Sequence, residues 1–290
     1  MSRPTFRFAP SPNGRLHLGH AYSALLNARI AERLGGRLLL RIEDIDPGRC
    51  RPEFVDGIRA DLDWLGLTFE ASIRRQSEHL SDYAAARDRL AAGGLTYPCF
   101  CSRGQIGADI AAREARGEGR ARDPDGAPLY PGTCRGLSPE EARARIARGE
   151  PHTWRLDMEA ALRTRTDPPV IRRFSPDDGA HETVAADPAR WGDAVIARRD
   201  VPTSYHLSVV WDDAVQGITH VVRGQDLEAA TDLHALLQGL LDLPAPAYHH
   251  HVLIRTESGE KLAKSKGSEA LAELRARGAT AGEVRAMLGF

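Results

Sequence analysis

The pattern of hydrophobic and polar positions predicts alternating strands and helices from the start of the chain. Residues 5–9 form a short apolar run that Pro10 interrupts, which predicts a strand, and helical spacing follows over about 18–34. Gly35 ends that helix, and residues 37–42 are an apolar run typical of a parallel strand buried on both faces. These segments therefore predict a βαβ unit within an α/β fold.

Two further helices are expected at about 52–65 and 79–93, after which the pattern changes. Residues 102–190 are rich in Arg, Gly, Pro and Asp with weak periodicity, and we interpret them as an insertion. The regular pattern resumes at 193–198, 205–215 and 219–224, then in a helix at about 226–241 and a strand at 250–254. Four regions follow: the first half of an α/β domain at 1–98, the insertion at 99–190, the second half of the domain with the lysine loop at 191–266 and a short helical tail at 267–290.

Composition and charge narrow the class of protein. The chain has 290 residues, of which 42% are hydrophobic, so it can bury a substantial core. The formal net charge of −1 excludes a general polyanion-binding surface, so nucleic acid would have to contact local patches. No stretch approaches the roughly 18 consecutive apolar residues of a membrane span, and the N-terminus lacks the apolar segment of a signal peptide. We therefore expect a cytoplasmic protein with no membrane segment.

The cysteines suggest a metal site. Cys99 and Cys101 are one residue apart and Cys134 follows in the same insertion, which supplies three corners of a tetrahedral site; three free thiols are the alternative. Cys50 has no evident partner and is expected to be a free thiol. The histidines at 249–251 alternate between the two faces of a strand, so they do not converge on one ion.

The HLGH motif lies where the first strand turns into the first helix, and this edge of an open α/β sheet binds ligands. A helix N-terminus suits phosphate, and His17 and His20 add donors that can follow charge as it develops there. Gly19 permits close approach of a nucleotide. The alternative is that both histidines are ordinary surface or capping residues.

Lysine occurs only at Lys261, Lys264 and Lys266, although Lys and Arg together number 39. These three residues follow the last predicted strand on a Gly- and Ser-flanked loop. A compact ammonium group on a mobile loop can reach a departing pyrophosphate late in adenylate transfer and stabilise the transition state. The alternative is a solvated basic loop, but its exclusive use of lysine indicates a requirement for ammonium groups.

The ordered pair of HLGH at 17–20 and KLAKS at 261–265 resembles the two signatures of class I aminoacyl-tRNA synthetases. The strings RFAPSPNGRLHLGHA, RIEDIDPGR and VVRGQDL are similar specifically to glutamyl-tRNA synthetases, and this resemblance covers nearly the whole chain. It implies a Rossmann-type parallel sheet, split by a zinc-containing insertion. Ala263 stands where the family usually has serine, so that hydroxyl is missing here.

The resemblance also implies site residues. Arg7 has the bidentate fork that suits a substrate carboxylate, and Glu43 matches the residue that receives the substrate ammonium. Without the resemblance, Tyr205 is interpreted instead as a core aromatic in a buried strand at 205–211. The implied L-glutamate contacts are Arg7, Phe8, Ala9, Pro10, Ser11, Glu43, Tyr205 and Arg223. The implied ATP contacts, with Mg²⁺, are His17, Gly19, His20, Lys261, Lys264 and Ser265, of which His17, His20 and Lys264 are catalytic.

The same resemblance completes the metal site. In the short members of the family a tyrosine four residues before the last cysteine is the fourth ligand, and Tyr130 stands there. The resemblance therefore implies one structural zinc ion on Cys99, Cys101, Tyr130 and Cys134.

The residues after Ser265 suffice for two short helices at most, which is too little for an anticodon-binding domain. The chain therefore resembles the short paralogues, the glutamyl-queuosine tRNA(Asp) synthetases. These activate L-glutamate with ATP, without tRNA, and attach it to the queuosine base at the wobble position of tRNA(Asp). Alternatives are a truncated glutamyl-tRNA synthetase that charges tRNA(Glu), a nucleotidyltransferase and a non-catalytic tRNA-binding module.

Overall fold

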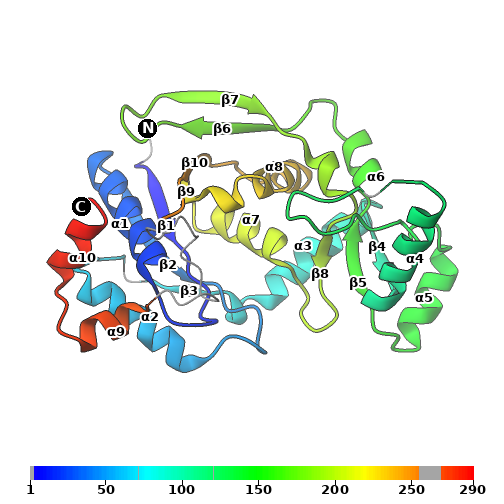
Figure 1. Ribbon diagram of the computed structural model, residues 1–290. Helices are drawn as coiled ribbons and strands as arrows, with labels where there is room; N and C mark the ends of the chain where they lie inside the picture. Colours follow the sequence, from blue (N-terminus) through cyan, green and yellow to red (C-terminus); the bar gives the residue numbers. More distant parts are fainter. Residues whose placement is uncertain (1–2, 71, 120, 255–268) are drawn as a thin grey trace.

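The computed structural model describes residues 3–70, 72–119, 121–254 and 269–290, and Figure 1 shows the arrangement of their elements. The strands and helices formed by the first part of the chain lie at one end of the molecule. A sheet of three antiparallel strands, which belongs to the insertion, lies at the other end. Helices α7 (Tyr205–Val215) and α8 (Ala230–Leu240) lie between them (Figure 1). No helix in the described ranges is both long enough and apolar enough to cross a membrane.

The predicted βαβ unit is confirmed, with nearly the predicted bounds. Strand β1 (Thr5–Phe8) pairs in parallel with β2 (Arg37–Ile42), and α1 (Leu18–Arg33) connects them. Leu40 packs into the core that includes residues of α1, whereas Leu39 belongs to a separate cluster that includes a residue of α8. Strand β2 is therefore covered on both faces, as its apolar run predicted.

The C-terminal helices pack against the N-terminal unit. Helices α9 (Leu271–Ala276) and α10 (Ala281–Met287) share a core with α2 (Pro52–Trp64), and the three lie side by side in Figure 1. Arg285 of α10 donates to the main-chain carbonyl of Leu65 at 2.7 Å. The prediction of two short terminal helices is confirmed. Other elements nearby are β3 (Arg74–Arg75), α3 (Leu80–Ala92) and 3-10 turns at Gln76–Glu78, Pro188–Trp191 and Gln225–Leu227.

A second sheet has the order β7-β6-β10-β9. Strands β6 (Val170–Phe174), β10 (Ala247–His251) and β9 (His220–Gly224) are parallel, and β7 (His181–Ala185) pairs antiparallel with β6 in a hairpin along one edge of the molecule (Figure 1). Helix α8 packs on this sheet through Ala235, which lies in one cluster with Val221 and Tyr248.

Strand β9 begins beside β1. The main-chain N–H of Thr219 donates to the carbonyl of Thr5 at 3.0 Å, and the Thr5 N–H donates to Thr219 Oγ1 at 2.8 Å. Phe8 at the end of β1 and Gly224 at the end of β9 both line one cavity. The two sheets thus meet at the edge where open α/β folds bind ligands.

The third sheet forms the centre of the insertion. Strand β5 pairs antiparallel with β4 on one side and β8 on the other. Helices α4 and α5 bury none of their residues, so they contribute little to the core. The elements of this unit are β4 (Thr96–Cys99), α4 (Arg103–Ala115), α5 (Pro139–Ala147), β5 (Thr153–Leu156), α6 (Met158–Arg163) and β8 (Val195–Ala197).

Sheet membership corrects the predicted boundary at 190. Strand β8 was expected in the second half of the catalytic domain but pairs with β5, whereas β6 and β7, inside the predicted insertion, pair with each other and with β10. The sequence does not reveal β6 and β7 because most of their side chains are at least partly exposed and three of the ten are charged. The division into four regions stays a prediction, with these strands exchanged.

Two local predictions were also wrong. The alternative of a buried strand at 205–211 fails because these residues begin α7, and a short apolar run does not distinguish a helix from a strand. The strand predicted at 250–254 lies earlier, at Ala247–His251, because its register pairs Ala247 with His220 and His251 with Gly224. The ladder ends where β9 ends.

Candidate active site and cysteine cluster

A cavity of about 700 Å³ opens where β1, β9 and the N-terminus of α1 meet. This volume lies in the range of about 300–1,000 Å³ that is typical of small-molecule sites. Every predicted glutamate contact lines the cavity, and so do three of the predicted ATP contacts. These residues are Arg7, Phe8, Ala9, Pro10, Ser11, Glu43, Tyr205 and Arg223, with His17, Gly19 and His20. Their roles stay predictions, but the fold brings them together from distant segments.

Two imidazoles close the N-terminus of α1. His17 is the N-cap residue, and its Nδ1 accepts from the main-chain N–H of Gly19 at 3.1 Å. His20 Nδ1 accepts from the N–H of His17 at 3.2 Å. Because both Nδ1 atoms accept, each ring carries its proton on Nε2 and keeps an N–H donor there. Two donors and the positive end of a helix dipole make this corner suited to phosphate.

Arg7 is held by a buried ion-pair network behind the cavity. Its Nε lies 3.1 Å from Asp213 Oδ1, and Arg41 Nη1 lies 2.8 Å from the same oxygen. Arg41 Nη2 also lies 3.3 Å from Glu43 Oε1. The network therefore holds Arg7 and Glu43, two predicted glutamate contacts, in a defined relative position before a ligand binds.

Burial and charge act in opposite directions on the acids of this network. Burial would raise the pKa of Asp213, but the adjacent Arg7 and Arg41 hold that pKa below its ordinary value. For Glu43 burial prevails, and its pKa is raised despite the nearby Arg41 and Arg7. A ligand ammonium beside Glu43 would favour the ionised form of this carboxyl group.

Arg223 and Tyr205 form another part of the cavity wall. Arg223 Nη1 donates to the hydroxyl of Tyr205 at 3.4 Å. Burial raises the pKa of Tyr205, so the phenol stays protonated and keeps a proton to donate. The pair therefore offers the cavity a positive charge and a hydroxyl donor, which suits a carboxylate ligand.

The predicted lysine loop, with Lys261, Lys264 and Ser265, lies outside the described residues. The residues on either side of it lie at the site. Ile254 lines the cavity. Ala270 forms a β-bridge with His17, next to a 2.9 Å hydrogen bond from the Leu271 N–H to the Leu16 carbonyl.

Sequence reasoning missed several residues of the site. Gly224 packs closely, since a Cβ there would lie 2.5 Å from Asp226 Oδ1 and 2.9 Å from Leu253 Cδ2, so those two side chains would have to shift. Asp212 and Asp213 gave a usable signal, because two acids in an apolar helix need buried partners. The other cavity residues that sequence reasoning missed are Ser23, Val222, Asp226, Leu227, His251, Leu253 and Ile254.

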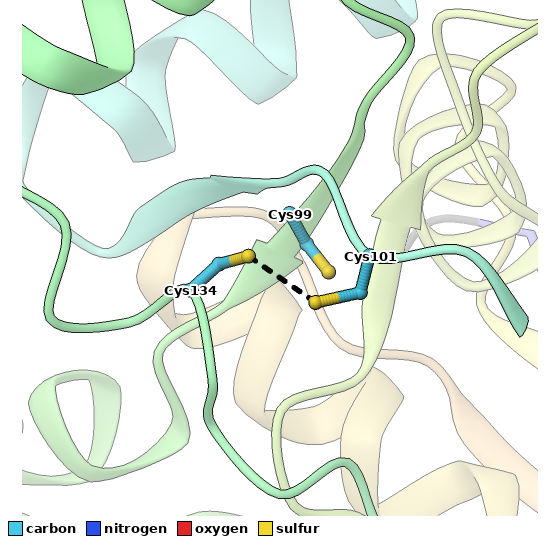
Figure 2. A group of neighbouring side chains, drawn as sticks. All are labelled: Cys99, Cys101 and Cys134. Atoms are coloured by element: carbon cyan, nitrogen blue, oxygen red, sulfur yellow. Dashed lines mark hydrogen bonds between the residues drawn. The ribbon is translucent and has the colours of Figure 1, made fainter. Parts of the chain in front are cut away.

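The three cysteines of the insertion converge, as predicted. Figure 2 shows Cys99 at the end of β4, Cys101 just after it and Cys134 from a separate loop, with their sulfur atoms directed toward one another. All three Sγ atoms lie within 4.8 Å of one another, and those of Cys101 and Cys134 are 3.4 Å apart. Cys50 is a free, half-buried thiol outside the cluster, as expected.

Tyr130 lies with the cysteines. Its hydroxyl oxygen is 3.5 Å from Cys101 Sγ and accepts from the main-chain N–H of Cys134 at 2.9 Å. The guanidinium carbon of Arg155 lies 3.8 Å from the centre of the Tyr130 ring. Burial raises the pKa of the Cys101 thiol to about 11, whereas hydrogen bonds from Tyr130 and Arg155 outweigh burial and lower the pKa of Cys99.

Comparison with known proteins agrees with this architecture. Residues 5–283 match the family described as tRNA synthetases class I (E and Q), catalytic domain. A protein of Rhodobacter capsulatus named Glutamyl-Q tRNA(Asp) synthetase is 45% identical over 98% of this chain and 99% of its own length. A protein of Nitrosococcus oceani named Glutamate–tRNA ligase 2 is 39% identical over 94% of this chain but only 56% of its own length.

Solved structures give the same fold. The crystal structure of the glutamate–tRNA synthetase from Elizabethkingia anophelis superposes with a TM-score of 0.73 and 28% sequence identity. The superposition covers 91% of this chain and 53% of that one. The mixed α/β fold with a parallel sheet is therefore that of a class I synthetase catalytic domain.

Proposed function

The chain belongs to the class I tRNA synthetases for glutamate and glutamine, and from this premise we propose that it is a glutamyl-queuosine tRNA(Asp) synthetase. It activates L-glutamate with ATP and transfers the glutamate to the queuosine base of tRNA(Asp) in the cytoplasm. The observation that carries the proposal is the cavity at the ends of β1 and β9, which gathers all eight predicted glutamate contacts beside the HLGH motif. The nearly full-length similarity to the Rhodobacter capsulatus protein supports the choice of tRNA.

In the first step the α-carboxylate of glutamate attacks the α-phosphorus of ATP, which binds with Mg²⁺, and pyrophosphate leaves. Glu43 receives the ammonium group of the substrate. Arg7, Arg223 and Tyr205 supply positive charge and hydrogen-bond donors for the carboxylates of the substrate. This arrangement converts a bimolecular encounter into a reaction between oriented groups.

The HLGH corner receives the phosphates. The Nε2–H groups of His17 and His20 donate to phosphate oxygens, and their hydrogen bonds strengthen as negative charge develops on the α-phosphate. Lys264 adds its ammonium group to the departing pyrophosphate, according to the sequence motif. In the second step the queuosine hydroxyl attacks the glutamyl-adenylate carbonyl, and AMP leaves.

The cysteine cluster fits one structural zinc ion. Tetrahedral coordination with bonds of about 2.3 Å to sulfur and 2.0 Å to oxygen would space two sulfur ligands about 3.8 Å apart and sulfur from oxygen about 3.5 Å. The Cys101–Cys134 sulfur separation of 3.4 Å and the Tyr130–Cys101 separation of 3.5 Å lie close to these values, and Cys99 Sγ lies within 4.8 Å of the other two sulfurs. Four protein ligands would make a closed site, which holds the insertion together and takes no part in the reaction.

The alternative function is charging of tRNA(Glu). It has support from the similarity to the Nitrosococcus oceani protein named as a glutamate–tRNA ligase. We favour tRNA(Asp) because the sequence identity to the Rhodobacter capsulatus protein is 45%, whereas it is 39% to the Nitrosococcus oceani protein.

The proposal is tested by incubating the protein with labelled glutamate, ATP and either tRNA(Asp) containing queuosine or tRNA(Glu). We expect label only on tRNA(Asp), and loss of labelling after mild periodate oxidation of the queuosine diol. Labelling of tRNA(Glu) alone would establish the alternative function.

A further inference from the structure

Arg223 differs from Arg7 in the kind of partner that it has. Arg7 is paired with Asp213, but no Asp or Glu lies within ion-pair distance of Arg223 in the part of the chain that the structure describes. Arg223 is also 6% exposed, so water does little to stabilise its charge. A buried cation without a counter-charge is costly, which calls for an explanation.

Neutral groups satisfy all the hydrogen-bond donors of Arg223. A guanidinium has five N–H groups, and five acceptors surround this one. They are His250 Nε2 at 3.2 Å from Nε, His234 Nδ1 at 3.3 Å and Tyr205 Oη at 3.4 Å from Nη1, and the Leu227 carbonyl at 3.1 Å and Thr231 Oγ1 at 2.7 Å from Nη2. The shell thus fixes the guanidinium plane without neutralising it.

The histidines of this shell are held uncharged. His250 Nε2 and His234 Nδ1 accept from Arg223, so neither nitrogen carries a proton, and His234 Nε2 lies 3.2 Å from His206 Nδ1. Burial and the nearby Arg223 lower the pKa of His234 well below its ordinary value, and lower those of His206 and His250 to about 4 and about 3. At neutral pH these three rings contribute acceptors but no charge.

We propose that His206, His234 and His250 are positioning residues that keep the charge of Arg223 uncompensated, so that the cavity selects an amino acid with an anionic side chain over its neutral amide. This inference rests on the proposed function, in which glutamate is the substrate. According to this inference, glutamine is rejected because the three histidines around Arg223 are uncharged, although they need not touch the substrate.

The physical basis is a difference in electrostatic energy. A carboxylate that approaches Arg223 gains charge–charge attraction in a poorly solvated cavity, and an amide of the same shape does not. A carboxylate already paired with Arg223 would remove this difference. The longest of the five contacts is the one to Tyr205, which also lines the cavity, so a ligand oxygen can share or replace it at little cost.

Two isosteric substitutions separate charge from shape. His234→Gln keeps a neutral acceptor beside Arg223. In His234→Glu the new side chain has the same size as glutamine but adds a negative charge. We expect His234→Glu to raise the KM for glutamate about 100-fold or more, with a smaller change in kcat, and to reduce the preference for glutamate over glutamine. His234→Gln should raise the same KM less than about 10-fold and keep most of the preference.

The measurement is glutamate- and glutamine-dependent ATP–pyrophosphate exchange, with thermal unfolding of each variant. If His234→Glu does not fold, the test is repeated at His250, which accepts a hydrogen bond from Nε of the same guanidinium. The two variants are then His250→Gln and His250→Glu. Equal losses in the Gln and Glu variants, or no loss in either, would overturn the inference. Absence of glutamate-dependent exchange in the wild-type protein would instead overturn the proposed function.

Discussion

The cavity and the cysteine cluster are assembled by different means. Arg7 and Asp213 are 206 positions apart in the chain, and apolar cores and buried ion pairs bring them together. Cys101 and Cys134 are only 33 positions apart, and the helices beside them, α4 and α5, bury no residues. The cavity is therefore assembled by long-range contacts, whereas the cysteines lie in a small apolar cluster with Phe100, Leu137 and Ile146, to which a bound metal would add cross-links.

The largest expected effect is on the cluster. Removing metal by chelation should unfold the region around Cys99 to Cys134, because structural zinc supplies about 10–16 kcal/mol in isolated zinc-finger peptides. Hydrogen exchange should accelerate in α4 and α5 but not in α1. Transfer to tRNA should fall more than glutamate activation. Elemental analysis that finds no stoichiometric metal in freshly prepared protein would contradict this prediction.

A comparable test in the cavity breaks its ion-pair network. Asp213→Asn leaves Arg7 and Arg41 short of a counter-charge and should lower the free energy of unfolding by about 3–5 kcal/mol. The control is Asp177→Asn, which removes the exposed ion pair between Asp177 and Arg33, whose atoms are 3.7 Å apart. This substitution should lower the free energy of unfolding by less than about 1 kcal/mol. Urea unfolding measures the free energy of unfolding of both variants. Equal losses in the two variants would contradict a stabilising role of the network.

The same network predicts a pH dependence. The pKa of Asp213 is lower in the folded protein than in the unfolded chain. Its contribution to stability is therefore fully present at pH values above the ordinary pKa of aspartate. That contribution should be lost as the pH falls through the lowered pKa. The unfolding free energies of the wild type and of Asp213→Asn should therefore converge in acid.

The lysine loop is expected to affect rate more than binding. Lys264→Ala should slow adenylate formation by about 10²–10³-fold, the effect of one donor to developing charge, and should change the dissociation constant of ATP much less. Lys264→Arg should restore part of the rate, since a wide planar group replaces a compact one. Pre-steady-state adenylate formation at saturating ATP measures this, and a wild-type rate in the alanine variant would identify a solvated basic turn.

The smallest expected effect is local to the cluster. Ser102 caps α4, with its Oγ accepting from the Gln105 N–H at 3.2 Å and the Gln105 side chain accepting from the Ser102 N–H at 2.7 Å. Ser102→Ala should destabilise α4 by about 1 kcal/mol. Hydrogen exchange of α4 amides should report the loss, while Ser138→Ala, at the N-cap of α5, should leave α4 unchanged.

The sequence predicted the first βαβ unit from its local pattern, and many residues of the cavity from short strings that resemble the family. The apolar run of β2, the HLGH motif and the strings around Arg7 and Arg223 are each readable in one short segment. The partners of these residues were not readable. Asp213 of α7 pairs with both Arg7 of β1 and Arg41 of β2 only because the fold brings these three elements together, and no local pattern encodes those contacts.

The histidines illustrate the same limit. Residues 249–251 were correctly placed on a strand, but the contact of His250 with Arg223 follows from the pairing of β10 with β9. His234 lies in an apolar helical segment, where its role as an acceptor for Arg223 depends on tertiary packing. Short apolar runs such as 205–211 fit a helix and a strand equally, so packing decided that element too.

The central claim is that the glutamate-activating site is complete in the cavity without tRNA. Its most direct test is ATP–pyrophosphate exchange with L-glutamate in the absence of any tRNA. Exchange that depends on glutamate and proceeds without tRNA is the predicted result, because the preformed network around Arg7, Glu43 and Arg223 needs no partner to assemble. Exchange that appears only when tRNA is added would contradict the account.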